Sequence, residues 1–165
     1  KNGMNEIAGF YTDEKTLLKC KFKADLISHL NGESFYVDFK TTNNLSDWSI
    51  RNTIKNFSYA TQLGFTAEGI KNIEGVYPKY CGWVFLGTTA PFEMKCYFAE
   101  APTIDYGIHK YRKNMDLLSE CLKRNHFPSY QEGGGFDLIG LPEYVTREAA
   151  EEILTEQGEY DGSDE

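Results

Sequence analysis

The sequence predicts a mixed α/β (α+β) domain, in which a central sheet of about five strands is flanked by helices. Three observations support this fold class. Residues 6–42 carry three strand patterns separated by turn signals, residues 80–86 form a nearly continuous apolar run, and residues 47–73 and 102–125 carry helical patterns. Because short turns join the first three strands, we expect a three-stranded antiparallel meander, and two further strands complete the sheet.

The alternation of side chains defines the faces of the meander. After a first strand at residues 6–12, residues 17–30 alternate and place Cys20, Phe22, Ala24 and Leu26 on one face. Asn31-Gly32 is typical of a hairpin turn and leads into a third strand, residues 35–42. In this strand Phe35, Val37 and Phe39 alternate with Tyr36, Asp38 and Lys40. We expect the apolar set to enter the core.

The rest of the chain supplies helices and two more strands. Ser46 is a plausible N-cap for a helix at residues 47–56, for which we expect three apolar anchors, Trp48, Ile54 and Phe57. A second helix at residues 59–73 should pack inward through Leu63 and Ile70. Strands are expected at residues 80–86 and 92–99, before a long helix that Pro102 opens.

The composition indicates one domain with a substantial core over residues 1–145, followed by a short helix and an acidic, flexible tail over residues 146–165. Eight of the 25 acids lie between Glu148 and Glu165, and the other 17 equal the Lys and Arg in number, so the body is neutral. Such a body does not exclude a nucleic-acid partner. No apolar run is long enough to span a bilayer, so no membrane partner is expected. The four dispersed cysteines predict reduced, mostly buried thiols in a cytoplasmic protein.

The third strand carries the candidate chemistry. Asp38 and Lys40 share one face, and the hairpin pairing places Asp25 near Asp38. Two close carboxylates repel unless a cation lies between them, so a divalent metal is an economical solution. The alternative is a solvated strand face with an ordinary ion pair.

Several basic and polar residues are further candidates, and each has a structural alternative. Lys21 and Lys23 either face phosphates or protect an exposed edge strand against aggregation. Arg51 and Lys55 share one face of their helix, four residues apart. Gln62 is either a site residue or a surface amide. A basic cluster at residues 109–113 either contacts phosphate or is a solvated helix face.

With these residues in place, the chain resembles the PD-(D/E)xK nuclease superfamily, and more specifically the RecE-type (exonuclease VIII) phage recombination exonucleases, relatives of lambda exonuclease. The resemblance extends from Glu6 to Pro142 and depends on the order and spacing of several motifs: Glu6, Cys20-Lys21-Phe22-Lys23-Ala24-Asp25, Asp38-Phe39-Lys40-Thr41-Thr42, Tyr59-Ala60-Thr61-Gln62, Trp83-Val84-Phe85-Leu86, Tyr111-Arg112-Lys113-Asn114 and Phe127-Pro128-Ser129-Tyr130. It implies a restriction-endonuclease-like core.

The resemblance also implies roles. Asp25 and Asp38 would bind metal, with the Phe39 carbonyl and Glu6 as further ligands, and Lys40 would orient or activate the attacking water. Gln62 would match the glutamine of the family's Q-x-x-x-Y motif. The residues expected to contact nucleic acid are Lys21, Lys23, Arg51, Lys55 and Tyr59.

The chain departs from the family pattern in three ways. Ala24 replaces the usual proline, and Thr66 replaces the tyrosine of Q-x-x-x-Y, whose role is vacant or passes to another side chain such as Tyr59. The chain also begins too late to contain the family's N-terminal helix, so the sequence predicts a fragment that lacks this segment.

The expected activity is Mg²⁺-dependent exonuclease cleavage of linear double-stranded DNA, with Mn²⁺ as a substitute metal. The resemblance further implies a ring-shaped homo-oligomer that acts on duplex ends in phage-type recombination, with a single-strand annealing protein as partner. The alternatives are an endonuclease of the same superfamily, a non-catalytic DNA-binding module on the same fold, and a structural protein that docks through its acidic tail. The absence of clustered cysteines argues against an iron–sulfur nuclease.

Overall fold

A computed structural model describes residues 3–131 and 133–160 of the chain. It divides into two compact units, Lys1–Phe127 and Pro128–Glu165, and each is described by itself. The elements of the first unit are β1 (Gly3–Thr12), β2 (Lys19–Leu30), β3 (Glu33–Thr42), α1 (Asp47–Asn56), α2 (Tyr59–Glu74), β4 (Tyr80–Gly87), β5 (Met94–Phe98) and α3 (Ala101–Arg124).

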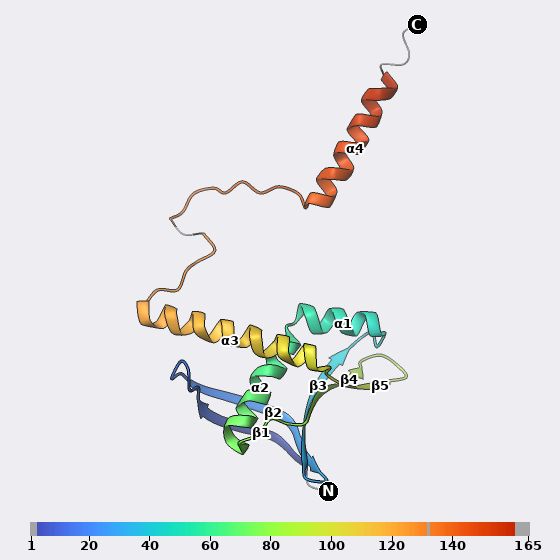
Figure 1. Cartoon of the computed structure of the whole chain (residues 1–165). Coiled ribbons are helices and arrows are strands. Elements are labelled where there is room, and N and C mark those ends of the chain that lie inside the picture. Colours follow the sequence, from blue (N-terminus) through green and yellow to red (C-terminus); the bar gives the residue numbers. More distant parts are fainter. Residues whose placement is uncertain (1–2, 132, 161–165) are drawn as a thin grey trace. The chain divides into compact units, whose positions relative to one another are not determined.

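The five strands form one mixed sheet in the order β1-β2-β3-β4-β5 (Figure 1). β1, β2 and β3 pair antiparallel, as expected for a meander, β3 pairs parallel with β4, and β4 pairs antiparallel with β5. A parallel pair needs a crossover connection, and α1 and α2 provide it. The predicted fold class, a five-stranded mixed sheet flanked by helices, is confirmed.

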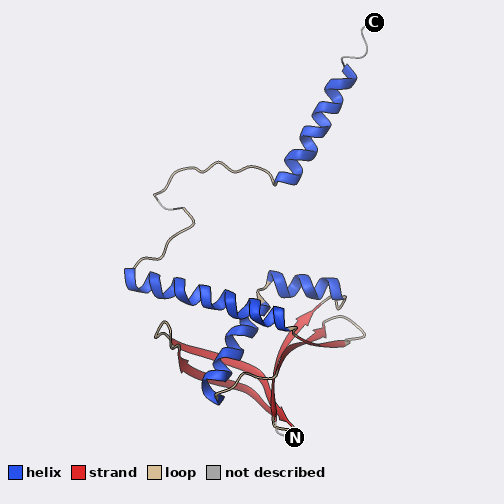
Figure 2. Cartoon of the chain, in the orientation of Figure 1, coloured by secondary structure: helices blue, strands red, loops and turns tan. Residues whose placement is uncertain are grey.

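The hydrophobic core lies between the sheet and α2, which contacts β1, β2 and β4 (Figure 2). The predicted inward residues of α2, Leu63 and Ile70, are each 1% exposed. Helices α1 and α3 both pack on α2, so they form a layer on the helical side of the sheet. The predicted inward residues of β2 are confirmed for Cys20, Phe22 and Ala24, but Leu26 is only partly buried and Ile27 enters the core instead.

The expectation for the two faces of β3 is wrong. Tyr36 and Asp38 are buried, at 0% and 2% exposure, whereas Phe39 is 44% exposed and Phe35 is only partly buried. Alternation defines which residues share a face, but the helical layer covers the face that carries the polar groups. The Phe35 ring stacks on Tyr80 on the other face of the sheet. The candidate acid therefore lies under α2 and not on an open strand face.

The anchors expected for α1 are also largely wrong. Trp48 and Phe57 are exposed, Ile54 is partly buried, and Ile50 is the residue of α1 that enters the core. Ser46 caps the helix as predicted, because its hydroxyl accepts a hydrogen bond from the Ser49 amide. Trp48 was expected to be an anchor because it is large and apolar. These properties did not predict which side chain of α1 is buried, and Trp48 in the first turn is exposed.

The second unit contains one helix, α4 (Glu143–Tyr160), where the sequence predicts a helix from about residue 146 to 156. The last part of the predicted acidic tail, residues 161–165, lies outside the described residues. No helix in the described part of the chain is long and apolar enough to cross a membrane. The four cysteines are free thiols, and all but Cys96 are buried.

Candidate active site

The second half of β3 carries the central pair of the candidate site. The side chain of Asp38 is buried against α2 and that of Lys40, two residues on, is 16% exposed, so both lie on the same face of the strand. The Lys40 Nζ lies 2.6 Å from the Oδ2 of Asp38. Apart from Lys40, this oxygen has no partner among the described residues. The pair places an acid and an ammonium at the boundary between core and solvent.

Two residues from the start of α2 fix the Lys40 ammonium. Lys40 donates a hydrogen bond of 2.9 Å to the Oε1 of Gln62, and the amide nitrogen of Gln62 donates to the Oδ1 of Asp38 at 3.1 Å. The Lys40 Nζ also lies 4.4 Å from the centre of the Tyr59 ring, which is a cation–π contact. Gln62 therefore bridges the two charged groups, which is a role that a surface amide does not have.

Asp25 comes to the same site from β2. The β2–β3 ladder ends at the pair of Leu26 and Val37, and beyond it the Oδ2 of Asp25 accepts a hydrogen bond of 2.9 Å from the Phe39 amide. The carboxylate thus takes the place of a backbone acceptor. Because Phe39 follows Asp38 in the chain, this hydrogen bond brings the two predicted aspartates to the same part of the site, where the Asp25 charge raises the pKa of Asp38.

The charges at this site are only partly balanced. Burial raises the pKa of Asp38 above the ordinary aspartate value, and the Asp25 charge adds to this, although the hydrogen bond and charge of Lys40 act in the opposite direction. A buried carboxylate oxygen that contacts only Lys40, beside a second carboxylate, offers a hard cation two oxygen ligands. These residues therefore fit a divalent ion.

The described residues contain no group of three or more His, Cys, Asp or Glu side chains placed to hold a metal. The site thus offers two carboxylates, and water would complete the coordination shell, as is usual for Mg²⁺. Glu6 does not join them: the β1–β2 register places it across from Asp25, but its side chain forms a 2.9 Å ion pair with Lys23. The structure does not show the Phe39 carbonyl engaged with a side chain of the site.

Tyr36 is the site residue that sequence reasoning missed. Its phenol donates a hydrogen bond of 3.4 Å to the Oδ1 of Asp38 and is itself hydrogen-bonded to the Thr66 hydroxyl. Thr66 is the residue that replaces the expected tyrosine of Q-x-x-x-Y, and it is 2% exposed. A phenol from β3 therefore lies beside the acid where the helix lacks one. The signal in the sequence was the spacing of two that places Tyr36 on the face of Asp38.

The residues expected to contact nucleic acid fall into two groups. Lys21 and Lys23 point away from the buried face of β2, and Lys21 lies over the ring of Phe10, 5.5 Å from its centre. Arg51 and Lys55 project from α1 into a cleft beside α3, close to Tyr59 in sequence. The structure therefore does not bring all five residues onto one surface.

The fold and the arrangement of Asp25, Asp38, Lys40 and Gln62 define a domain of the PD-(D/E)xK nuclease superfamily. Residues 2–138 match the family described as "PDDEXK-like domain of unknown function (DUF3799)". The chain belongs to this family, because the match covers most of its length. No curated protein is similar enough to the chain to count as a match.

Two solved structures are similar to the chain. The crystal structure of a "Putative exonuclease" from Eubacterium rectale is similar over 90% of this chain and 57% of its own, with 15% identity and a TM-score of 0.61. That of the protein SSO0001 is similar over 70% of this chain and 50% of its own, with 15% identity and a TM-score of 0.47. At this identity the first likeness shows the fold alone. The chain spans 57% of the length of the first protein and 50% of that of the second.

Proposed function

We propose that this chain is a divalent-metal-dependent deoxyribonuclease that hydrolyses phosphodiester bonds from the ends of linear double-stranded DNA. The observation that carries the proposal is the contact of Lys40 with Asp38, held by Gln62 and placed next to Asp25. An ion pair with a purely structural role would not need a second carboxylate, that of Asp25, or the Gln62 amide that bridges Asp38 and Lys40. The similar structure from Eubacterium rectale is described as that of a "Putative exonuclease", which supports the choice within the superfamily.

The residues of the chain have distinct roles in the proposed reaction. Asp25 and Asp38 would hold Mg²⁺ or Mn²⁺, which when bound supplies a Lewis acid at the scissile phosphate. The Lys40 ammonium adds positive charge where negative charge accumulates in the transition state, and it is positioned to orient the attacking water. Gln62 and Tyr59 restrict this ammonium to one position, so little reorganisation is needed during the reaction.

The wider assignments remain predictions that accompany this function. They are the relation to RecE-type enzymes of phage recombination, the assembly of a ring-shaped homo-oligomer, and the cooperation with a single-strand annealing protein. The metal-ligand role of Glu6 also remains a prediction, although its pairing with Lys23 does not favour it.

The test is digestion of a linear duplex labelled at one 5′ end, with Mg²⁺ or with EDTA, beside a closed circular duplex. We expect Mg²⁺-dependent loss of the linear DNA while the circle stays intact. Asp38→Asn and Lys40→Ala should each lower the rate by about 10²–10³-fold or more, because each removes charge that acts on the reacting phosphate.

Asp105→Asn is the matched control, because Asp105 is exposed on α3 and is not part of the site. This variant should digest the linear DNA at the wild-type rate. Cutting of the circle would replace the exonuclease by an endonuclease on the same fold. Full activity of Asp38→Asn would refute the site, and absence of cleavage of both substrates by the wild-type protein would favour a non-catalytic DNA-binding module.

A further inference from the structure

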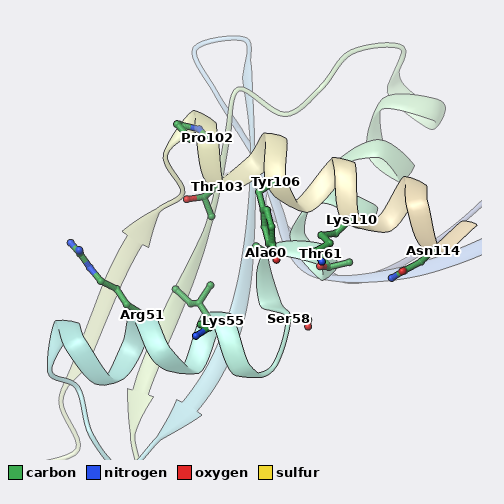
Figure 3. Close-up of a pocket in the computed structure, with 11 residues that line it drawn as sticks. Arg51, Lys55, Ser58, Ala60, Thr61, Pro102, Thr103, Tyr106, Lys110 and Asn114 are labelled. Atoms are coloured by element: carbon green, nitrogen blue, oxygen red, sulfur yellow. The ribbon is translucent and has the colours of Figure 1, made fainter. Parts of the chain in front are cut away.

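A cleft of about 490 Å³ lies beside the candidate active site, between α1, the start of α2 and the first half of α3 (Figure 3). Arg51 and Lys55 come from α1, and Tyr106 and Lys110 come from α3 on the opposite wall (Figure 3). Ala60, at the start of α2, lies between them. Asp38 and Lys40 do not line this cleft, so it is a separate site.

The cleft is lined by positive charge and by no acid. Its lining contains three cations, Arg51, Lys55 and Lys110, and no acid. None of the three forms an ion pair within residues 3–131 and 133–160. Asp47, one turn before Arg51, instead contacts Lys95 and Tyr97. Three cations that line one cleft without forming ion pairs favour an anionic ligand.

An aromatic side chain lies among these cations. Tyr106 is 54% exposed, and the Lys110 Nζ lies 5.6 Å from the centre of its ring. An exposed ring beside cations is the combination with which proteins hold single-stranded nucleic acid, because phosphates meet the charges and a base stacks on the ring. The volume lies within the range of small-ligand pockets, about 300–1,000 Å³, which suits a few nucleotides of one strand and not the full width of a duplex.

The chain connects the cleft directly to the candidate active site. Ser58, Ala60 and Thr61 line the cleft, whereas Tyr59 and Gln62, which alternate with them at the start of α2, contact Lys40. One short segment therefore forms a wall of both sites. A DNA strand bound in the cleft would therefore lie next to the segment of α2 that contacts Lys40.

We propose that this cleft binds a single-stranded segment of the DNA substrate, through phosphate contacts from Arg51, Lys55 and Lys110 and base stacking on Tyr106. The inference rests on the proposed function for the identity of the ligand as DNA. It adds a strand-binding site that contributes affinity and does not touch the scissile bond.

The experiment measures binding of a short fluorescein-labelled single strand by anisotropy, in EDTA so that no cleavage occurs, over a series of salt concentrations. A cation that contacts a phosphate of a single strand contributes about 0.7 to the slope of log K against log salt, which is about five-fold in affinity at 0.1 M salt. Lys110→Gln should therefore lower the affinity about five-fold and reduce the salt slope by about 0.7. The triple variant Arg51→Gln, Lys55→Gln, Lys110→Gln should lose about 100-fold in affinity and about 2 in slope.

Lys123→Gln is the matched control, because Lys123 is another exposed lysine of α3, about 20 Å further along the helix. It should bind like the wild-type protein. Tyr106→Leu should lose about five-fold or more in affinity with an unchanged salt slope, because stacking carries no counterion release. Equal affinity and slope of Lys110→Gln and the wild-type protein would overturn the proposal.

A blunt duplex of the same sequence identifies the form of the ligand. We expect its binding to depend weakly on Lys110 and Tyr106, and a dependence as strong as that of the single strand would overturn the single-strand assignment. The two proposals fail separately. If the protein cleaves linear DNA but the variants bind the single strand like the wild-type protein, only the strand site is refuted. If the variants lose binding as predicted but the protein cleaves no DNA, only the nuclease activity is refuted.

Discussion

At the scale of single residues, the position of Asp38 decides what the candidate site can do. The carboxyl lies under α2, where burial raises its pKa, and four side chains meet it or its neighbour: Tyr36, Gln62, Lys40 and Asp25. A buried carboxyl with this many directed contacts has one orientation, which is what a metal ligand requires. The geometry thus makes Asp38 the most constrained acid of the candidate site.

The Tyr36 phenol and the Thr66 hydroxyl should act as one unit. Tyr36→Phe leaves Thr66 and the Oδ1 of Asp38 with one partner fewer, so we expect a loss of about 1–3 kcal/mol in the free energy of unfolding. Thr66→Val should cost a similar amount. Because each change removes the same hydrogen bond, the double variant should cost less than the sum, by about 0.5 kcal/mol or more in a urea denaturation cycle.

Additive losses in this cycle would show that the two hydroxyls do not interact. Tyr97 offers a control, since its hydroxyl donates to the exposed Asp47 and not to the site. Tyr97→Phe combined with Thr66→Val should be additive, because the two residues share no hydrogen-bond partner among the described residues.

At the scale of elements, the crossing of α2 and α3 determines the shape of both sites. The helices meet at two glycines: a Cβ on Gly107 would lie 1.9 Å from the Ala60 carbonyl oxygen, and one on Gly64 would lie 2.5 Å from the Ile108 amide nitrogen. Both obstacles are backbone atoms, which cannot rotate away. The close approach holds α3 against the start of α2, where Ala60 lines the cleft and Gln62 reaches Asp38.

Gly107→Ala should therefore destabilise the fold, although alanine is the better helix former. Separating two packed helices to admit a methyl group costs about 1–3 kcal/mol or more, which thermal unfolding followed by circular dichroism would detect. Gly140→Ala is the control, since nothing lies within 4 Å of the added Cβ. A Gly107→Ala protein with wild-type stability would show that the helices do not cross this closely in solution.

At the scale of the whole first unit, one ionic network ties distant elements together. The Arg112 guanidinium of α3 donates to Asp13, in the β1–β2 turn, and at 2.7 Å to Glu68 of α2, and the Tyr77 hydroxyl donates to Glu68 as well. Asp13 and Glu68 are 1% and 5% exposed. Arg112 belongs to the basic cluster for which phosphate binding was one expectation, and its two carboxylate partners assign it a structural role.

This network predicts a pH-dependent contribution to stability. Burial opposes ionisation of Asp13, but hydrogen bonds from Thr16 and Arg112 outweigh it and lower the pKa of the carboxyl. A group whose pKa is lower in the folded state stabilises the fold above its unfolded pKa of about 3.9, and the contribution is lost as the pH falls through the folded value. Asp13→Asn should cost about 3 kcal/mol at pH 7, because it breaks a buried ion pair.

Urea denaturation of the wild-type and Asp13→Asn proteins between pH 7 and pH 3 measures this contribution. The difference between the two proteins should be constant above about pH 4 and shrink below it. Asp105→Asn, which removes an exposed acid of the same kind, should give no such pH-dependent difference. A difference that stays constant down to pH 3 would contradict the lowered pKa of Asp13.

The sequence alone was sufficient for the fold class and the principal pair of the candidate site. Alternation is a local property, so it defined β2 and β3 and placed Asp38 beside Lys40, and the Asn31-Gly32 turn predicted the antiparallel pairing that brings Asp25 close. Only the tertiary structure decided which face of β3 is buried, since both faces of a sheet strand can carry apolar residues and the position of α2 chooses between them.

Two further predictions differ in the same way: the one that depends on a local pattern is confirmed, and the one that depends on tertiary packing is wrong. Leu63 and Ile70 follow the helical period and are buried, whereas the position of Trp48 depends on what packs against α1, and its side chain is exposed. The contact between Tyr36 and Thr66 joins residues far apart in the chain, as does the cleft that Arg51 and Lys110 both line. Such contacts follow from the packing of α1, α2 and α3 against one sheet, which no local pattern in the sequence specifies.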